Sequence, residues 1–140
     1  MSLLPDRPGK AIWYAVLIWL SGFVWGSIIF MIPVLKATEP VPYISSNPAI
    51  SFPIILFWCL LAKFLAGKYL TPDDTPNNGL PLGLTFLLTN VLLDLLVIVF
   101  AFNKGYQYYL SLSVWAAYAI LVMVPLKVAS KTSDIAPDPV

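Results

Sequence analysis

Apolar residues in this chain form four long runs, which polar and proline-containing segments separate. A helix needs about 20 predominantly apolar residues to cross the hydrocarbon layer of a membrane. Four stretches have that length, namely residues 11–35, 50–70, 80–102 and 106–126. The pattern therefore predicts an all-α fold, an integral membrane bundle of four transmembrane helices that forms a single domain over residues 1–140.

Proline and short polar segments mark the predicted connections. Residues 36–47 and 71–79 each contain prolines and are expected to be loops. The third connection is only residues 103–105, which predicts a tight hairpin between the last two helices. Pro33 and Pro125 fall near the ends of the first and fourth runs, where we expect them to kink or end the helices.

The distribution of lysine and arginine predicts how the helices are oriented. Four spans place both polar tails, residues 1–9 and 130–140, on one side, where we expect them to be poorly ordered alone. Six basic residues belong to that side: Arg7, Lys10, Lys63, Lys68, Lys127 and Lys131. The other side carries only Lys36 and Lys104, with three tyrosines typical of an interfacial aromatic belt: Tyr106, Tyr108 and Tyr109. Because cytoplasmic loops carry the excess of Lys and Arg, we expect both termini in the cytoplasm and the chain in the plasma (inner) membrane.

The composition excludes several classes of protein. Hydrophobic residues make up 59% of the chain and charged residues 11%, whereas soluble domains have about 45–50% and about 25%. A soluble domain of 140 residues could not bury so much apolar surface, which excludes a soluble enzyme, a disordered chain and a secreted disulfide scaffold. The net charge of +1 gives no basic excess for nucleic acid. The expected partners are the lipid bilayer and another membrane protein or a second copy of the chain.

Residue types that usually carry catalysis are scarce. The chain has no histidine, the commonest metal ligand and general base at neutral pH, and a single cysteine. No two carboxylates share one membrane depth, and no glycine-rich phosphate loop is present. We therefore expect no catalytic residues, no metal site and no cofactor, and we do not expect an enzyme.

Asp94 lies deep inside the third run. An acid there costs about 2.5–3.5 kcal/mol on insertion scales, so it should face a helix interface or a wet cavity. Asn90 is four residues earlier and shares its helix face. Matching residues by depth along the helices adds Tyr118 from the fourth run and Trp25 and Ser27 from the first. These five form a candidate ion, proton or ligand site, or else polar contacts that hold the bundle together.

Two pairs of small residues at four-residue spacing predict seams of close helix packing. Gly22 and Gly26 form a G-x-x-x-G motif, and Ala62 and Ala66 form a similar pair in the second run. Small side chains let two helix backbones approach closely in a membrane. The seams could join two copies of the chain or two helices within it.

Two function classes follow from these observations. The first is a non-enzymatic small polytopic membrane protein that acts by helix–helix association, as an accessory or assembly subunit of a membrane complex or as a small homo-oligomer. The alternative is a small proton- or cation-coupled transporter with Asp94 as its ion or proton site. In size and number of spans the chain resembles the small multidrug exporters. They carry their working acid in the first helix, whereas the first run here has none, which argues against membership.

Overall fold

The computed structural model describes residues 3–33, 48–71, 78–103 and 105–135. These residues form α1 (Pro8–Met31), α3 (Pro48–Tyr69), α4 (Gly79–Leu93), the π-helix η2 (Asp94–Ala101), the 3-10 helix η3 (Tyr106–Leu110) and α5 (Leu112–Ile135). Because η2 continues α4 without a break, four helical units are long and apolar enough to cross a membrane. The predicted fold class, an all-α membrane bundle of four spanning helices, is confirmed.

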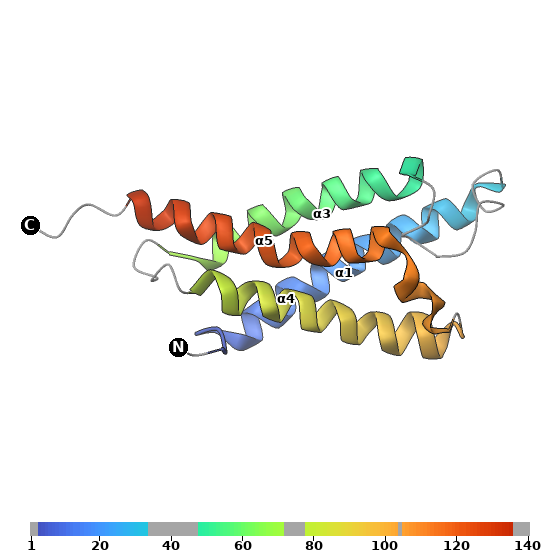
Figure 1. Cartoon of the computed structure of the whole chain (residues 1–140), viewed down its shortest axis with the longest axis horizontal. Coiled ribbons are helices and arrows are strands. Elements are labelled where there is room, and N and C mark those ends of the chain that lie inside the picture. Colours follow the sequence, from blue (N-terminus) through green and yellow to red (C-terminus); the bar gives the residue numbers. More distant parts are fainter. Residues whose placement is uncertain (1–2, 34–47, 72–77, 104, 136–140) are drawn as a thin grey trace, which may run out of the picture.

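The helices alternate in direction, so α1 and α4 begin at the end of the bundle where α3 and α5 finish (Figure 1). We call this the terminal end, because α1 begins and α5 finishes there, and we call the opposite end, where η2 finishes and η3 begins, the hairpin end. α1 packs beside α3 and α4, and α5 packs beside the same two helices. The contact between α1 and α3 is the least extensive of these four.

Glycines bring α4 and α5 together. A Cβ atom on Gly79 would lie 2.6 Å from the Cβ of Ala129, and one on Gly83 would lie 2.9 Å from the carbonyl oxygen of Val122. The two helices therefore approach backbone to backbone near the terminal end, as small residues allow in membranes. This contact fixes the first turns of α4 against α5.

The helix bounds differ most from the predicted spans at the first and fourth spans, and α1 also begins three residues earlier than predicted. α1 ends at Met31 rather than at residue 35, and Ile32 is extended with φ −94° and ψ 109°. Proline at position 33 explains this end, because proline disfavours the helical conformation of the residue before it. Residues 34 and 35, and the predicted loop 36–47, lie outside the described residues.

The fourth span begins and ends later than predicted. Residues 106–110 form the separate η3, and α5 then runs from Leu112 through Pro125 to Ile135. Pro125 is buried and does not end the helix, because neighbouring helices can support the backbone of a membrane helix at a proline. The predicted polar tail 130–140 is consequently helical up to residue 135.

Large apolar side chains cover the outer faces of all four helices, where lipid would surround a membrane protein. They include Leu20, Val24, Leu56, Phe64, Leu88, Leu92, Leu96 and Met123. Buried polar side chains among the described residues are Ser51, Asn90 and Asp94, and the last two lie on one face of α4 and η2. The interior is thus apolar except for a few polar side chains, and the candidate site lies among them.

Candidate functional site

Asp94 stands at the point where α4 changes into a π-helix. Its side chain is 0% exposed, and its backbone N–H donates to the carbonyl oxygens of both Asn90 and Val91. Short π-helical stretches inside α-helices occur frequently at functional sites. The change of helix type makes Asp94 the first residue to consider for function.

Three donors from three segments converge on the Asp94 carboxyl group. The indole Nε1 of Trp19 on α1 donates to Oδ1 at 2.9 Å. The hydroxyl of Tyr108 on η3 donates to Oδ2 at 3.0 Å, and the hydroxyl of Tyr118 on α5 donates to the same oxygen. We call Trp19, Asp94, Tyr108 and Tyr118 the Asp94 cluster. It joins α4 to α1, η3 and α5 through one carboxyl group.

The hairpin positions Tyr108 within this cluster. Asn103 (φ 52°) and Gly105 (φ 71°) both have a positive φ, which suits the reversal of the chain between η2 and η3. Tyr109 adds a second contact from η3, because its hydroxyl donates to the carbonyl oxygen of Val91 at 3.3 Å. Partial burial raises the pKa of Tyr109, and the nearby Asp94 carboxyl adds to the rise. The phenol therefore stays protonated at neutral pH and remains a donor.

Aromatic rings hold the other two donors in place. The Trp19 indole stacks on Phe23 with ring centroids 5.4 Å apart. The Tyr118 ring meets Trp115 edge to face with centroids 6.0 Å apart. Such pairs restrict ring orientation. They therefore help to hold the Trp19 indole N–H and the Tyr118 hydroxyl toward the Asp94 carboxyl group.

Asn90 occupies the next polar level of the bundle. Its Nδ2 donates to the carbonyl oxygens of Phe86, at 2.8 Å, and of Ala15 on α1, at 3.3 Å. Its Oδ1 is buried and has no hydrogen-bond partner among the described residues. Asn90 thus ties α4 to α1 and keeps one acceptor unused.

The five residues proposed from the sequence do not all meet. Asp94 and Tyr118 are hydrogen-bonded, and Asn90 lies one turn before Asp94. Trp25 instead donates to the carbonyl oxygen of Ile50 at 3.2 Å, and Ser27 donates to that of Phe23 at 2.9 Å. Neither of these last two hydrogen bonds involves Asp94.

Depth matching paired Asp94 with the wrong level of the first helix. The residue that reaches it is Trp19, six positions before Trp25, and Asn90 likewise contacts Ala15 rather than a later residue. Counting residues from the membrane edge gives the depth of a side chain only if all helices stand upright and begin at the same depth. α1 instead crosses the bundle obliquely beside α4 (Figure 1), so equal counts do not give equal depth.

Two members of the cluster were absent from the predicted site. The sequence predicts Tyr108 in an interfacial belt, but its side chain is 2% exposed, whereas Tyr106 is 66% exposed and fits that position. Trp19 carried a usable signal, because tryptophan far from an interface must find an acceptor for its N–H. The sequence contains no signal that identifies Tyr108, because the burial of its side chain depends on how the hairpin folds back.

The small-residue pairs lie inside the bundle. A Cβ on Gly22 would lie 2.7 Å from Cζ2 of Trp58, whose Nε1 donates to Ser21 Oγ at 3.1 Å. Gly22 therefore makes room for an indole ring of α3 rather than for a second helix backbone. Ala62 and Ala66 are fully buried, and Gly26 is buried as well. These seams face other parts of the same chain.

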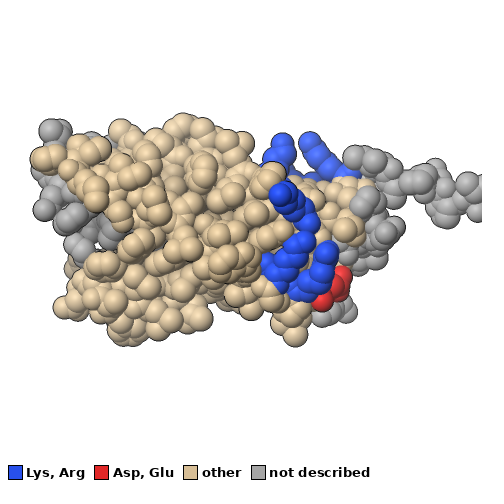
Figure 2. Space-filling model, turned by 180° about the vertical axis from the view of Figure 1, so that it is seen from behind, with Lys and Arg blue, Asp and Glu red and all other residues tan. Residues whose placement is uncertain are grey.

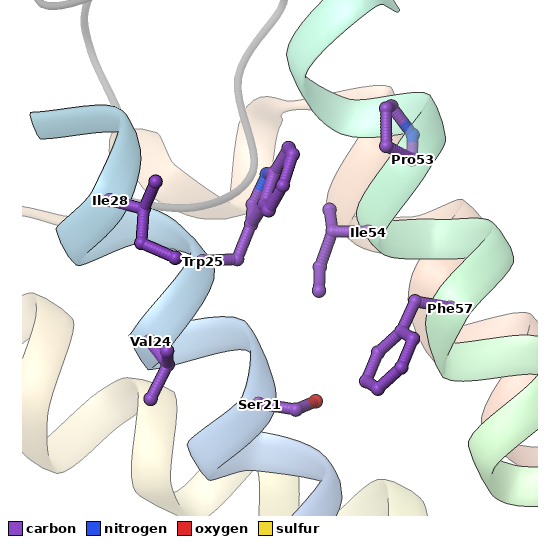
Figure 3. A pocket seen from close by; sticks show the side chains of 7 residues that line it. All are labelled: Ser21, Val24, Trp25, Ile28, Pro53, Ile54 and Phe57. Carbon is purple, nitrogen blue, oxygen red and sulfur yellow. The ribbon is translucent and has the colours of Figure 1, made fainter. Parts of the chain in front are cut away.

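A groove opens between α1 and α3 (Figure 3). It has a volume of about 460 Å³ and is lined by Ser21, Val24, Trp25, Ile28, Pro53, Ile54 and Phe57. Its polar groups are already occupied, because Ser21 Oγ donates to the carbonyl oxygen of Ile18 and the Trp25 indole donates to Ile50. The groove therefore offers an apolar surface.

The part of the chain that the structure describes contains no group of three His, Cys, Asp or Glu residues placed to hold a metal ion. No family model matches the chain, and neither a curated protein nor a solved structure matches it.

Proposed function

We propose that this chain is a non-enzymatic multi-pass protein of the plasma (inner) membrane that acts by associating with other membrane helices. It would serve as an accessory or assembly subunit of a larger complex or as a small homo-oligomer. The observation that carries the proposal is the apolar groove between α1 and α3, which lies on the outside of the bundle between two spanning helices.

The polar side chains hydrogen-bond to one another inside the bundle, which supports helix association rather than catalysis. Three side chains that could bind a substrate, Trp19, Tyr108 and Tyr118, donate to Asp94 inside the bundle. The outward surface is built from large apolar side chains. Helices associate in membranes through van der Waals packing, and a groove between two helices can accept the ridge of side chains on a third.

The charged residues support the proposed orientation. Figure 2 shows the Lys and Arg side chains of one face gathered in a band near the terminal end. Because the excess of such residues stays on the cytoplasmic side, this end would face the cytoplasm. Both termini would then be cytoplasmic, since α1 begins and α5 finishes at the same end of the bundle (Figure 1).

Site-specific photocrosslinking in native membranes tests the proposal. A crosslinking amino acid at Val24 or Phe57, which line the groove, should yield a defined adduct with a protein partner or a second copy. Leu92 on α4 is the matched control, because it is similarly exposed (54% against 56% for Val24) and does not line the groove. Lipid adducts alone from all three positions, with extraction only as a monomer, would contradict the proposal.

One observation favours a second candidate, a small proton- or cation-coupled carrier. Asn90 Oδ1 is a buried acceptor with no partner in the described part of the chain, and it lies one turn from a buried carboxyl group. A buried polar group without a partner calls for an explanation, and a bound ion or a catalytic role is one. A transported proton or cation would use Asp94 as its site and Asn90 as its neighbour.

Liposome flux separates the two candidates. A carrier should move protons or cations under an imposed pH gradient, and Asp94→Asn should abolish the flux while the protein remains folded. Thr85→Val is the control, because the Thr85 hydroxyl donates only to the backbone of its own helix at Pro81. An absence of flux from the unmodified chain would remove the carrier and leave association.

A further inference from the structure

The bundle brings together basic side chains that are dispersed along the sequence. Arg7 and Lys10 belong to the start of α1, Lys63 and Lys68 to α3, and two more lysines to the last turns of α5. Figure 2 shows Lys and Arg of the visible face in one band near the terminal end, while the remainder of that face carries none. The sequence contains no run of like charge that predicts this band, because the basic residues come from three helices.

Part of this positive charge is engaged by the protein itself. The Arg7 guanidinium donates to the carbonyl oxygen of Tyr69 and lies 4.7 Å from the centroid of its ring. Lys10 Nζ donates to the carbonyl oxygen of Lys68 at 3.3 Å. The Lys68 ammonium in turn lies 4.5 Å from the ring centroid of Phe64. These contacts hold the start of α1 against the end of α3 and place the charges at one level.

Three other lysines are available to a ligand. The ammonium groups of Lys63, Lys127 and Lys131 make no hydrogen bond or ring contact within the described residues, and all three side chains are exposed. Lys127 and Lys131 are four residues apart on α5 and so share a face. α5 packs along α3, the helix that carries Lys63.

The depth of these lysines indicates which anion they meet. Lys63 falls within the span Ala49–Tyr69, and Lys127 and Lys131 fall in the last turns of Leu112–Thr132. Long lysine side chains in such positions lay their apolar stems along the hydrocarbon and extend the ammonium group to the headgroup layer. Phosphate groups of lipids occupy that layer, whereas an acidic segment of a soluble protein would have to enter it.

We propose that Lys63, Lys127 and Lys131 form a binding surface for the headgroups of anionic phospholipids in the leaflet at the terminal end. A Lys or Arg side chain near an anionic membrane surface is attracted to it by about 1 kcal/mol. The chain as a whole has a net charge of only +1. The attraction therefore depends on where the basic residues gather rather than on overall charge.

Quenching of tryptophan fluorescence by brominated lipids tests this surface in the full chain reconstituted into vesicles. Trp13 is 57% exposed on α1, one turn after Lys10, and reports on lipid at the terminal end in a chain whose equally exposed Trp115 is replaced by phenylalanine. Quenching gives the binding constant of brominated phosphatidylglycerol divided by that of brominated phosphatidylcholine. This ratio should exceed one and should fall as salt is added. Each of Lys63→Gln, Lys127→Gln and Lys131→Gln should lower it about fivefold.

Gln107→Glu is the matched control. It also lowers the net charge by one, but Gln107 is exposed on η3 at the hairpin end, so the preference for phosphatidylglycerol should not change. Equal constants for the two lipids in the unmodified chain would overturn the proposal. So would an equal loss in Gln107→Glu and Lys127→Gln, or displacement of phosphatidylglycerol by soluble polyglutamate.

Discussion

Replacing Asp94 by leucine tests whether its carboxyl group holds the bundle together. Leucine retains side-chain volume but removes both oxygen acceptors. The indole N–H of Trp19 and the hydroxyls of Tyr108 and Tyr118 then lose the acceptor to which all three donate. Because these donors come from three different segments, α1, η3 and α5 each lose a link to η2.

The expected loss of stability follows from those three hydrogen bonds. Side-chain hydrogen bonds between membrane helices contribute about 0.6 kcal/mol on average and about 1.7 kcal/mol at most. Three of them give an expected decrease of about 2–5 kcal/mol in the free energy of unfolding. Asp94→Asn keeps one acceptor and a similar shape, so its decrease should be about 1 kcal/mol or less.

The assay is reversible unfolding of the chain in mixed micelles by titration with a denaturing detergent, followed by tryptophan fluorescence. Trp19 should report the loss directly, because its indole is buried against Asp94. A double-mutant cycle between Asp94→Leu and Tyr118→Phe should give a coupling energy of about 0.6–1.7 kcal/mol. If Asp94→Leu were as stable as the unmodified chain and the coupling were zero, the hydrogen-bonded cluster would not be a structural link.

Five further substitutions test helix packing and the Tyr108 hydrogen bond in the same unfolding assay. Gly22→Ala should destabilise by about 1–3 kcal/mol, because its new Cβ would lie 2.7 Å from the indole ring of α3; Gly67→Ala, whose Cβ meets nothing within 4 Å, should instead stabilise by about 0.5–1 kcal/mol. Gly83→Ala should destabilise similarly by about 1–3 kcal/mol, since the Cβ would lie 2.9 Å from the facing backbone of α5, and an unchanged midpoint would argue against this close approach. Tyr108→Phe should lose about 0.6–1.7 kcal/mol, whereas Tyr106→Phe, at an exposed position, should leave stability unchanged.

Asp94 and Tyr118 show how far single-sequence reasoning reached within the site. Asp94 stood out because a carboxyl group inside an apolar run must find partners, and Tyr118 followed from simple depth along the fourth span. Trp25 and Ser27 followed from the same argument and make other contacts. The argument assumed a common depth scale for all helices, and α1 departs from it.

Gly22 illustrates the same limit for packing. The G-x-x-x-G spacing indicates close contact, and Gly22 is in close contact, but with the indole of Trp58 rather than with another helix backbone. A spacing motif identifies a position without a side chain. It does not identify which group fills the space, because that group comes from a helix whose rotation the motif does not contain.

The sequence by itself determined the four spanning helices and their class of fold. This is a local property, because a long apolar run in a membrane must satisfy its backbone hydrogen bonds within its own helix. Only the tertiary structure decided that Trp19 and Tyr108 reach Asp94 and that the small-residue seams face inward. Those contacts depend on the tilt, rotation and offset of each helix, which packing of all four helices against one another sets together.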